Sequence, residues 1–308
     1  MKRRTLMAST IHQRFVSRLP SLQEETGEEL FVSGLVGPYR IFQRKNGHRH
    51  GIDDAATAWY ALQNTPQVKK TLDLGTGIGT VGLAVLWGLG EEAELTCIEA
   101  QDISYRLLTE NILGNGLNGS VRAIHGDIRD LDLGERFPLI TGSPPYFPIG
   151  TGSLPEDSQK AHARFELRGD VGDYARAAKR HITEDGLFVF CFPFQQKSRC
   201  IKLVTDVGFR LMTIRDVVPM KSKPSLFSLY CASLGFTGAV TEEDPLIVAF
   251  EDGKYTPEML AIQATRGFGP EGTNEIALRV AGGIRAQLDA VIRVDPHQRQ
   301  FHEETSSK

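Results

Sequence analysis

Short apolar runs alternate with amphipathic stretches through the middle of the chain. The runs have the length of buried strands, and the stretches between them have the spacing of helices. The predicted strands are 71–74, 94–98, 121–124, 137–142, 187–192, 209–214 and 226–234, and the predicted helices are 53–64, 80–89, 102–113, 170–182 and 196–207. Such alternation indicates an α/β fold with a mostly parallel, seven-stranded sheet and helices on both faces. The last two strands have no helix between them, which favours an antiparallel edge strand.

The same pattern divides the chain into three parts. Residues 1–29 form a basic extension, residues 30–236 form the α/β domain with a β-rich entry segment, and residues 237–308 form a mostly helical C-terminal extension. Within the last part, helical spacing covers 255–263 and 274–293. The first 23 residues contain five basic residues and no acid, which fits an organelle transit peptide, an RNA-binding arm or, most commonly for such a stretch, a disordered or lightly packed extension. Without a secretory signal, we expect a cytoplasmic protein, and we favour a monomer.

Composition excludes several classes of protein. Apolar residues make up 41% of the 308 residues and charged residues 24%, so the chain can bury an ordinary core. A net charge of −3 is unlike the basic excess of proteins that coat duplex DNA. No apolar run has the length of a membrane span, so we expect no membrane partner. Candidate phosphate contacts are Arg44, Lys45, Arg49, Arg164, Lys221 and Lys223.

Four cysteines, Cys97, Cys191, Cys200 and Cys231, lack the spacing of metal ligands and are predicted to be buried free thiols. No other residues show a metal-binding pattern, so we expect no metal. Phe188, Phe190, Phe192 and Phe194 alternate along a predicted strand, which indicates core packing rather than a base-stacking surface.

A glycine-rich turn follows the first predicted strand of the α/β domain. Gly75 and Gly77 would let a ligand approach the backbone, with Thr76 between them, and the next helix begins directly afterwards. Residues 77–82 also fit the dinucleotide pattern G-x-G-x-x-G. An acid at Asp73 would face a bound cation better than a pyrophosphate, which favours S-adenosyl-L-methionine over a dinucleotide or a scaffold without a ligand.

Two further acids follow predicted strands and would lie at the same sheet edge. Glu99, followed by Ala100, stands where a carboxylate binds ribose hydroxyls. Asp127, followed by Ile128, could accept from an adenine amino group. Taken singly, Glu99 could be a solvated carboxylate and Asp127 a helix N-cap. Because both acids occur together with the glycine turn, we assign Glu99, Asp127 and the residues that follow them, Ala100 and Ile128, to cofactor binding.

The most informative residues are Ser143, Pro144, Pro145 and Tyr146, which directly follow the predicted strand 137–142. Two successive prolines hold the backbone extended. A small acceptor, two stiff residues and an aromatic ring together predict a clamp for a planar group that bears an NH2. We assign these four residues to catalysis and place Ser143 also beside the cofactor.

These motifs resemble the class I methyltransferases that modify exocyclic or amide nitrogens, which implies a Rossmann-like fold and S-adenosyl-L-methionine as cofactor. Residues 38–236 resemble more narrowly the bacterial tRNA(Val) adenine-N6 methyltransferases. The segments that carry this likeness are Pro144–Pro148, His162–Glu166, Asp173–Tyr174, Thr183–Gly186, Gln43 and Gly51–Asp53. The resemblance implies an RNA substrate, in particular tRNA, and adds Gly51 and Asp53 to the cofactor site.

The chain departs from this group at Ser143, because the group has Asn there. A serine hydroxyl is still an acceptor but has a shorter reach and no amide donor. Serine at this position is also similar to DNA cytosine-N4 methyltransferases. Four hypotheses therefore stay open: adenine-N6 methylation of RNA, methylation of a protein glutamine, cytosine-N4 methylation, and an RNA-binding module without turnover.

Overall fold

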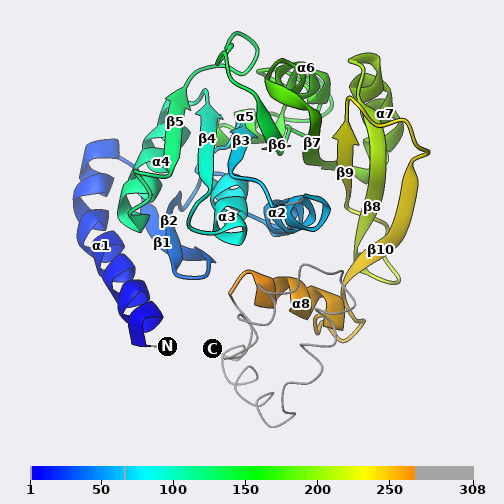
Figure 1. Ribbon diagram of the computed structural model, residues 1–308. Coiled ribbons are helices and arrows are strands. Elements are labelled where there is room, and N and C mark those ends of the chain that lie inside the picture. The colour runs from blue at the N-terminus through cyan, green and yellow to red at the C-terminus, as the bar shows by residue number, and fades with distance from the viewer. Residues whose placement is uncertain (1, 66, 268–308) are drawn as a thin grey trace. The chain divides into compact units, whose positions relative to one another are not determined.

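An eight-stranded mixed sheet forms the centre of the computed structural model, which describes residues 2–65 and 67–267 (Figure 1). Its strands in spatial order are β10 (Thr241–Ala249), β8 (Arg210–Met220), β9 (Phe227–Ser233), β7 (Ile182–Pro193), β6 (Phe137–Gly142), β3 (Lys70–Leu74), β4 (Glu94–Glu99) and β5 (Val121–His125). Pairing from β7 through β5 is parallel, whereas β9 pairs antiparallel with both β7 and β8. A separate antiparallel pair consists of β1 (Leu30–Val36) and β2 (Tyr39–Arg44).

The helices of the described chain are α1 (Lys2–Thr26), α2 (Ile52–Asn64), α3 (Thr80–Leu89), α4 (Asp102–Asn115), α5 (Ser158–Arg164), α6 (Val171–His181), α7 (Lys197–Asp206) and α8 (Pro257–Thr265), with a 3-10 turn at Phe194–Gln196. Strand alternation decides which face each covers. Leu72 and Leu74 pack with residues of α6 and α7, whereas Asp73 between them contacts the first turn of α3. Thus α3 and the α6–α7 pair cover opposite faces.

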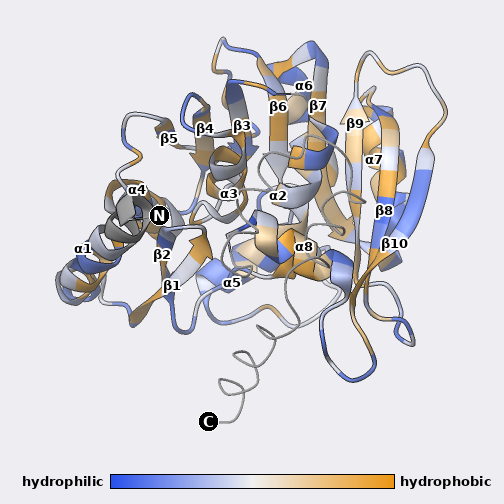
Figure 2. Cartoon of the chain, turned by 60° about the horizontal axis from the view of Figure 1, so that its bottom comes forward, coloured by the Kyte–Doolittle hydropathy of each residue, from blue (hydrophilic) through white to orange (hydrophobic). Residues whose placement is uncertain are grey.

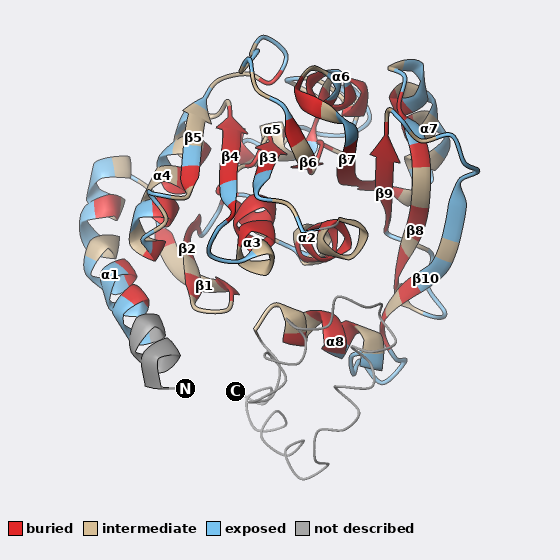
Figure 3. Ribbon diagram, in the orientation of Figure 1, coloured by how far each residue is buried: buried red, intermediate tan, exposed pale blue. Residues whose placement is uncertain are grey.

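The core lies where apolar side chains of the central strands meet these helices. Figure 3 shows the central strands and α3 as largely buried. Phe188, Phe190 and Phe192 are completely buried, and the Phe190 ring stacks on Tyr230 with centroids 4.9 Å apart. The predicted core position is therefore confirmed for these three, whereas Phe194, predicted with them, is only partly buried and lies in the 3-10 turn after β7. All four cysteines are buried and free, also as predicted.

The predicted mostly parallel α/β fold is confirmed, with two corrections. The sheet has eight strands instead of seven, and β10 lies beyond β8, so the predicted antiparallel pair of β8 and β9 is not at the edge. The additional strand, β10, comes from residues that the sequence assigned to a mostly helical extension. Its first half is acidic and contains Pro245, which hides its strand character; Figure 2 shows the change from hydrophilic to hydrophobic along it.

The chain forms two compact units. Of the described residues, 2–65, 67–217 and 225–245 belong to one unit, and 218–224 and 246–267 belong to the other. In the second unit, Thr256 caps α8 by accepting from the Met259 N–H, and its hydroxyl donates to the Ile247 carbonyl. The helix predicted at 255–263 corresponds to α8, and the helix predicted at 274–293 lies outside the described residues. The boundaries predicted at residues 29 and 236 stay a prediction.

The N-terminal extension forms helix α1, which packs on β1, β2 and α4. Ile11, Phe15 and Leu22 are buried along one side of it. Arg18 pairs with Glu110 of α4 and with Glu25, so this basic residue is engaged within the protein rather than presented as part of an open arm. The alternatives for this segment rested on composition, which does not reveal an apolar stripe with acidic partners elsewhere. The transit peptide and the RNA-binding arm stay predictions.

Replacing Phe15 with alanine should lower the free energy of unfolding by about 3–5 kcal/mol, the usual cost of emptying a buried phenylalanine site. Phe15 is fully buried, and its ring lies 4.5 Å from that of Phe42, measured between centroids. Urea denaturation followed by circular dichroism measures the change. Val16→Ala is the matched control, because Val16 is 50% exposed and should change stability by less than about 0.5 kcal/mol. Equal effects of the two substitutions would contradict packing of α1.

Within the described ranges 2–65 and 67–267, no helix is both long enough and apolar enough to cross a membrane.

Candidate active site

A cavity of about 330 Å³ opens at the carboxyl ends of β3, β4, β5 and β6. Parallel strands place the residues that follow them at one sheet edge, where open α/β sheets bind ligands. The predicted site residues that line this cavity are Asp53, Asp73, Gly75, Thr76, Gly77, Glu99, Ala100, Asp127, Ile128, Ser143, Pro144, Pro145 and Tyr146. Gly51 is not part of the lining; it is the N-cap residue of α2, and its N–H donates to Asp54.

Asp73 organises the turn after β3. Its carboxylate accepts from the hydroxyl groups of Thr76 (2.5 Å) and Thr141 (2.7 Å) and from the backbone N–H of Gly82 (3.0 Å). Burial raises the pKa of Asp73, and these three donors oppose that shift. The carboxylate thus joins the glycine turn, α3 and β6, and both of its oxygens already have partners within the protein.

Glu99 holds the opposite side of the same turn. One carboxylate oxygen accepts from the N–H of Gly77 at 2.8 Å, and the other accepts from the N–H of Gln101 at 2.7 Å. Burial raises the pKa of Glu99, whereas the backbone N–H groups lower it. Gly75 and Gly77 have positive φ values of 58° and 59°, which only glycine adopts readily. A side chain on Gly75 would also collide with Tyr174, whereas Gly77 faces open space.

Asp127 has a partner of its own. Its carboxylate accepts from the backbone N–H of Arg129 and from that guanidinium, at 2.7–2.9 Å. These contacts hold the pKa of Asp127 below its ordinary value. Asp127 therefore accepts from a nearby backbone N–H, as an N-cap residue does, and it also lines the cavity. Both predictions for it, an N-cap and a ligand contact, have a structural basis.

The Ser-Pro-Pro-Tyr clamp is held by contacts from three elements. The hydroxyl of Tyr146 donates to Asp53 of α2 at 2.8 Å and lies 3.3 Å from the Cys191 sulfur of β7. The Ser143 hydroxyl lies 3.4 Å from the same sulfur. The backbone N–H groups of Tyr146 and Phe147 both donate to the Arg164 carbonyl, at 3.0 and 2.8 Å. The clamp is thereby fixed on the sheet, on α2 and on the segment around α5.

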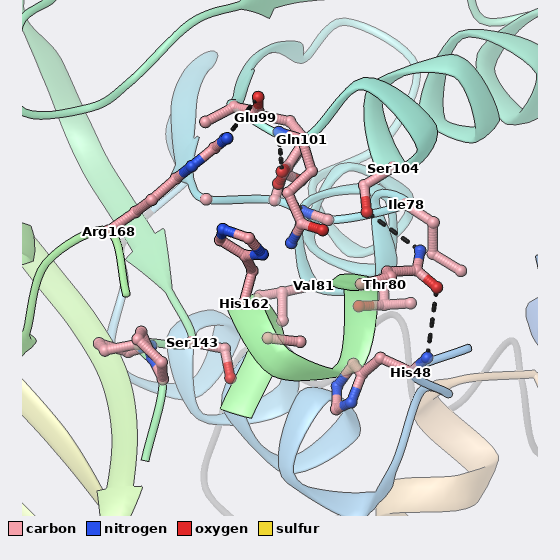
Figure 4. A pocket seen from close by; sticks show the side chains of 18 of the residues that line it. His48, Ile78, Thr80, Val81, Glu99, Gln101, Ser104, Ser143, His162 and Arg168 are labelled. Carbon is pink, nitrogen blue, oxygen red and sulfur yellow. Dashed lines mark hydrogen bonds between the residues drawn. The ribbon is translucent and has the colours of Figure 1, made fainter. Parts of the chain in front are cut away.

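Helix α5 and its flanks form one wall of the cavity, and the sequence did not predict it as a helix. The Gln159 side chain donates to Ser104 of α4 and accepts from the backbone N–H of His48 (Figure 4). His162 of α5 points into the cavity between Gln101 and Ser143 (Figure 4). Arg44, predicted as a phosphate contact, is instead buried and paired with Glu28 and Asp157. Its ion pairs join the entry segment to the start of α5.

Further residues line the cavity that were not predicted as site residues, although Tyr174 belongs to a segment that carries the family resemblance. Arg168 donates to the Ala100 carbonyl at 2.7 Å, and Asp54, Gln159 and Tyr174 also line the cavity. None of these stands in a strand-end motif, so no local pattern identified them as site residues. Of the residues predicted to contact phosphates, Arg164 does lie at the cavity.

Comparison with known proteins agrees with this geometry. Residues 45–153 match the family described as methyltransferase small domain. The chain is 28% identical over 195 residues to the tRNA1(Val) (adenine(37)-N6)-methyltransferase of Tolumonas auensis, covering 63% of this chain and 80% of that protein. Its counterpart in Actinobacillus pleuropneumoniae serotype 7 is 23% identical over 198 residues, covering 64% of this chain and 81% of that protein. The predicted resemblance is thus confirmed.

This chain is a methyltransferase that uses S-adenosylmethionine. The crystal structure of a predicted O-methyltransferase from Agrobacterium tumefaciens has the same fold, with a TM-score of 0.53 and 18% identity, covering 69% of this chain and 96% of that one. A ribosomal protein uL3 glutamine methyltransferase of Francisella tularensis is 28% identical over 163 residues, covering 50% of this chain and 51% of that protein. The predicted class I methyltransferase fold and its cofactor are therefore confirmed.

The cavity of this methyltransferase fits S-adenosylmethionine. Five acidic side chains line it, from Asp53, Asp54, Asp73, Glu99 and Asp127, and the cofactor is cationic at its sulfonium and amino groups. The open space in front of Gly77 admits a ligand against the backbone. In the described part of the chain no group of three or more His, Cys, Asp or Glu side chains could hold a metal ion.

Cofactor affinity should rise with pH until the pH passes about 8. Burial, and next the neighbouring Asp53 carboxylate, raise the pKa of Asp54 to about 8. Below that pH the carboxyl group carries a proton in the free protein. A cation in the cavity favours the charged form, so binding releases that proton and tightens as pH rises. Titration calorimetry with S-adenosylmethionine at several pH values measures this slope. The slope of affinity against pH should be smaller in Asp54→Asn. An unchanged slope would refute Asp54 as the group that releases the proton.

Proposed function

We propose that this methyltransferase modifies an exocyclic amino group of RNA, most specifically N6 of adenine in a tRNA. The observation that carries the proposal is the clamp of Ser143, Pro144, Pro145 and Tyr146 on the wall of the cofactor cavity. Relatives that act on adenine N6 of tRNA1(Val) match about two thirds of this chain and support that substrate.

The cofactor side of the cavity is assigned to the glycine turn and the three strand-end acids. Glu99 would bind the ribose hydroxyl groups, and Asp127 with the Ile128 backbone would meet the adenine ring. Asp73 would act through the turn that it holds in place, since its carboxylate accepts from three donors that join the turn, α3 and β6. Gly75, Thr76, Gly77 and Ala100 would form the floor, and Asp53 would lie between the cofactor and Tyr146.

The clamp would act on the substrate by positioning and hydrogen bonding. An aryl amine is a poor nucleophile because its lone pair is delocalised into the ring. Ser143 Oγ and the Pro144 carbonyl would accept the two amino hydrogens, which favours a pyramidal nitrogen, and the Tyr146 ring would stack on the base. When bound, S-adenosylmethionine supplies a methyl group on a sulfonium, which is a good leaving group. Positioning can therefore provide most of the acceleration, and no strong general base is needed.

The surroundings of the clamp suit a nucleic acid strand. Arg164 and Lys160 of α5 form no salt bridge with any described residue, and Arg164 lines the cavity. Phe147, directly after the clamp, is 38% exposed. Cations for phosphates next to an exposed aromatic ring are the usual elements of single-strand recognition. A base in a loop is the least costly to bring into such a site, because it is already unpaired.

A second candidate is methylation of a protein glutamine. The planar amide presents the same NH2 geometry as adenine N6, and the uL3 glutamine methyltransferase of Francisella tularensis is 28% identical over the matched half of its length. The two remaining alternatives are methylation of cytosine N4 and an RNA-binding module without turnover.

The partition of label between RNA and protein decides between the two leading substrates. The purified protein would be incubated with methyl-labelled S-adenosylmethionine and a bacterial lysate that had been depleted of small molecules. RNase and protease digestion of parallel samples then show which polymer holds the label. We expect label that RNase releases and protease does not. Label that only protease releases would contradict an RNA substrate and support a protein substrate.

A further inference from the structure

One buried thiol touches both polar side chains of the clamp. The sulfur of Cys191 lies 3.4 Å from the Ser143 hydroxyl oxygen and 3.3 Å from the Tyr146 hydroxyl oxygen. Cys191 is fully buried on β7, between Phe190 and Phe192, which point to the opposite face and into the core. The proposed chemistry uses Ser143 and Tyr146 but gives no role to this sulfur.

Counting hydrogens decides the direction of each contact. The Tyr146 hydroxyl has one hydrogen and donates it to the Asp53 carboxylate, which can only accept. In the 3.3 Å contact between the two groups the hydrogen therefore comes from the Cys191 thiol, which donates to the Tyr146 oxygen. Having used its hydrogen, the sulfur can only accept at its second contact, so the Ser143 hydroxyl donates to it.

Burial keeps these hydrogens in place. It raises the pKa of Cys191 to about 12 and raises the pKa of Tyr146 well above its ordinary value, so both groups stay protonated near neutral pH. Thr57 also reaches Cys191, but its hydroxyl donates to the Asp53 carbonyl at 2.7 Å. Thr57 can therefore only compete with Tyr146 as an acceptor of the thiol hydrogen.

We propose that Cys191 is a positioning residue that makes Ser143 a hydrogen-bond acceptor for the substrate amino group. This inference rests on the proposed N-methyl transfer. A serine hydroxyl can donate or accept, and a donated hydrogen aimed at the substrate nitrogen would occupy the lone pair that must attack. The chain from Ser143 through Cys191 and Tyr146 to Asp53 draws that hydrogen away and leaves the lone pairs of Ser143 Oγ for the amine. An asparagine carbonyl needs no such help, because it has no hydrogen.

The first test needs no turnover. The S–H stretching band of Cys191 is identified by infrared difference spectroscopy against Cys191→Ala. Tyr146→Phe removes the acceptor, so the band should move to higher frequency, whereas Thr57→Val should leave it in place. A band that moves in Thr57→Val and not in Tyr146→Phe would overturn the proposal, because the thiol would then donate elsewhere.

The second test is kinetic. In single-turnover methyl transfer, Cys191→Ala should slow the reaction about tenfold, the scale of one aligned hydrogen bond. Cys191→Ser should restore the rate to within about threefold, because a hydroxyl can both donate and accept. In a Ser143→Asn background, Cys191→Ala should cost less than about twofold, because the acceptor no longer has a hydrogen to direct.

Cys231→Ala is the matched control, since Cys231 is equally buried on the adjacent strand β9 and lies outside the cavity. It should leave the rate unchanged. Equal costs of Cys191→Ala in the serine and asparagine backgrounds would make Cys191 a packing residue and overturn the proposal. If no variant methylates any substrate, the proposed function fails, and the infrared result still decides the direction of the hydrogen bonds.

Discussion

Replacing Tyr146 with alanine should slow single-turnover methyl transfer by about 10- to 100-fold, because stacking on a flipped base is worth about 1–3 kcal/mol. The affinity for S-adenosylmethionine should change by less than about threefold, since Tyr146 contacts Asp53, Cys191 and Phe192 rather than the glycine turn. Rapid-quench kinetics at saturating cofactor measures the rate, and titration calorimetry measures the affinity.

Tyr105→Ala provides the comparison for this experiment. Tyr105 is also partly buried and stacks on His125 with centroids 4.6 Å apart, but it does not line the cavity. Its loss should leave the rate of the chemical step unchanged. Losses of equal size in rate and cofactor affinity for Tyr146→Ala would sink the assignment of this ring to the substrate.

Replacing Glu99 with alanine should have the converse effect and weaken binding of S-adenosylmethionine about 10- to 100-fold, on the scale of a lost charged hydrogen bond or two. The carboxylate holds the Gly77 N–H at 2.8 Å and the Gln101 N–H at 2.7 Å, so its removal also loosens the turn against which the cofactor binds. Titration calorimetry gives the affinity directly. Once the cofactor is saturating, the rate of transfer should fall far less than the affinity.

Glu94→Ala is the control for this substitution, because Glu94 stands at the other end of the same strand, is exposed, and lies outside the cavity. It should leave cofactor affinity unchanged. A Glu99→Ala protein that binds the cofactor as tightly as the wild type would leave Glu99 as a structural anchor of the turn alone.

Strand-end motifs could be predicted from the sequence because their positions follow from local pattern. Apolar runs located β3 to β6, and parallel pairing then required Asp73, Glu99, Asp127 and Ser143 to gather at one edge. The strand-end motifs do not predict which hydrogen-bond donors each carboxylate accepts from. Asp127 was expected to be available to a ligand, yet Arg129 two residues later engages it.

Contacts between segments far apart in sequence account for what the sequence did not predict. In the sequence Cys191 is one more apolar position in β7, and only its distances to Ser143 and Tyr146 indicate the proposed positioning role. Helix α1 looked like a basic tail because the acid that pairs with Arg18, Glu110, lies 92 residues away. Buried contacts between distant side chains, such as that of Phe15 with Phe42, likewise cannot be predicted from hydrophobic periodicity.

The central claim, methyl transfer to adenine N6 in RNA, is tested most directly by nucleoside mass spectrometry. Unmodified bacterial tRNA would be incubated with the purified protein and methyl-deuterated S-adenosylmethionine and then digested to nucleosides. We expect deuterated N6-methyladenosine with the wild-type protein and about 10- to 100-fold slower accumulation with Tyr146→Ala. Deuterated N4-methylcytidine, or no labelled nucleoside from a protein that binds the cofactor normally, would contradict it.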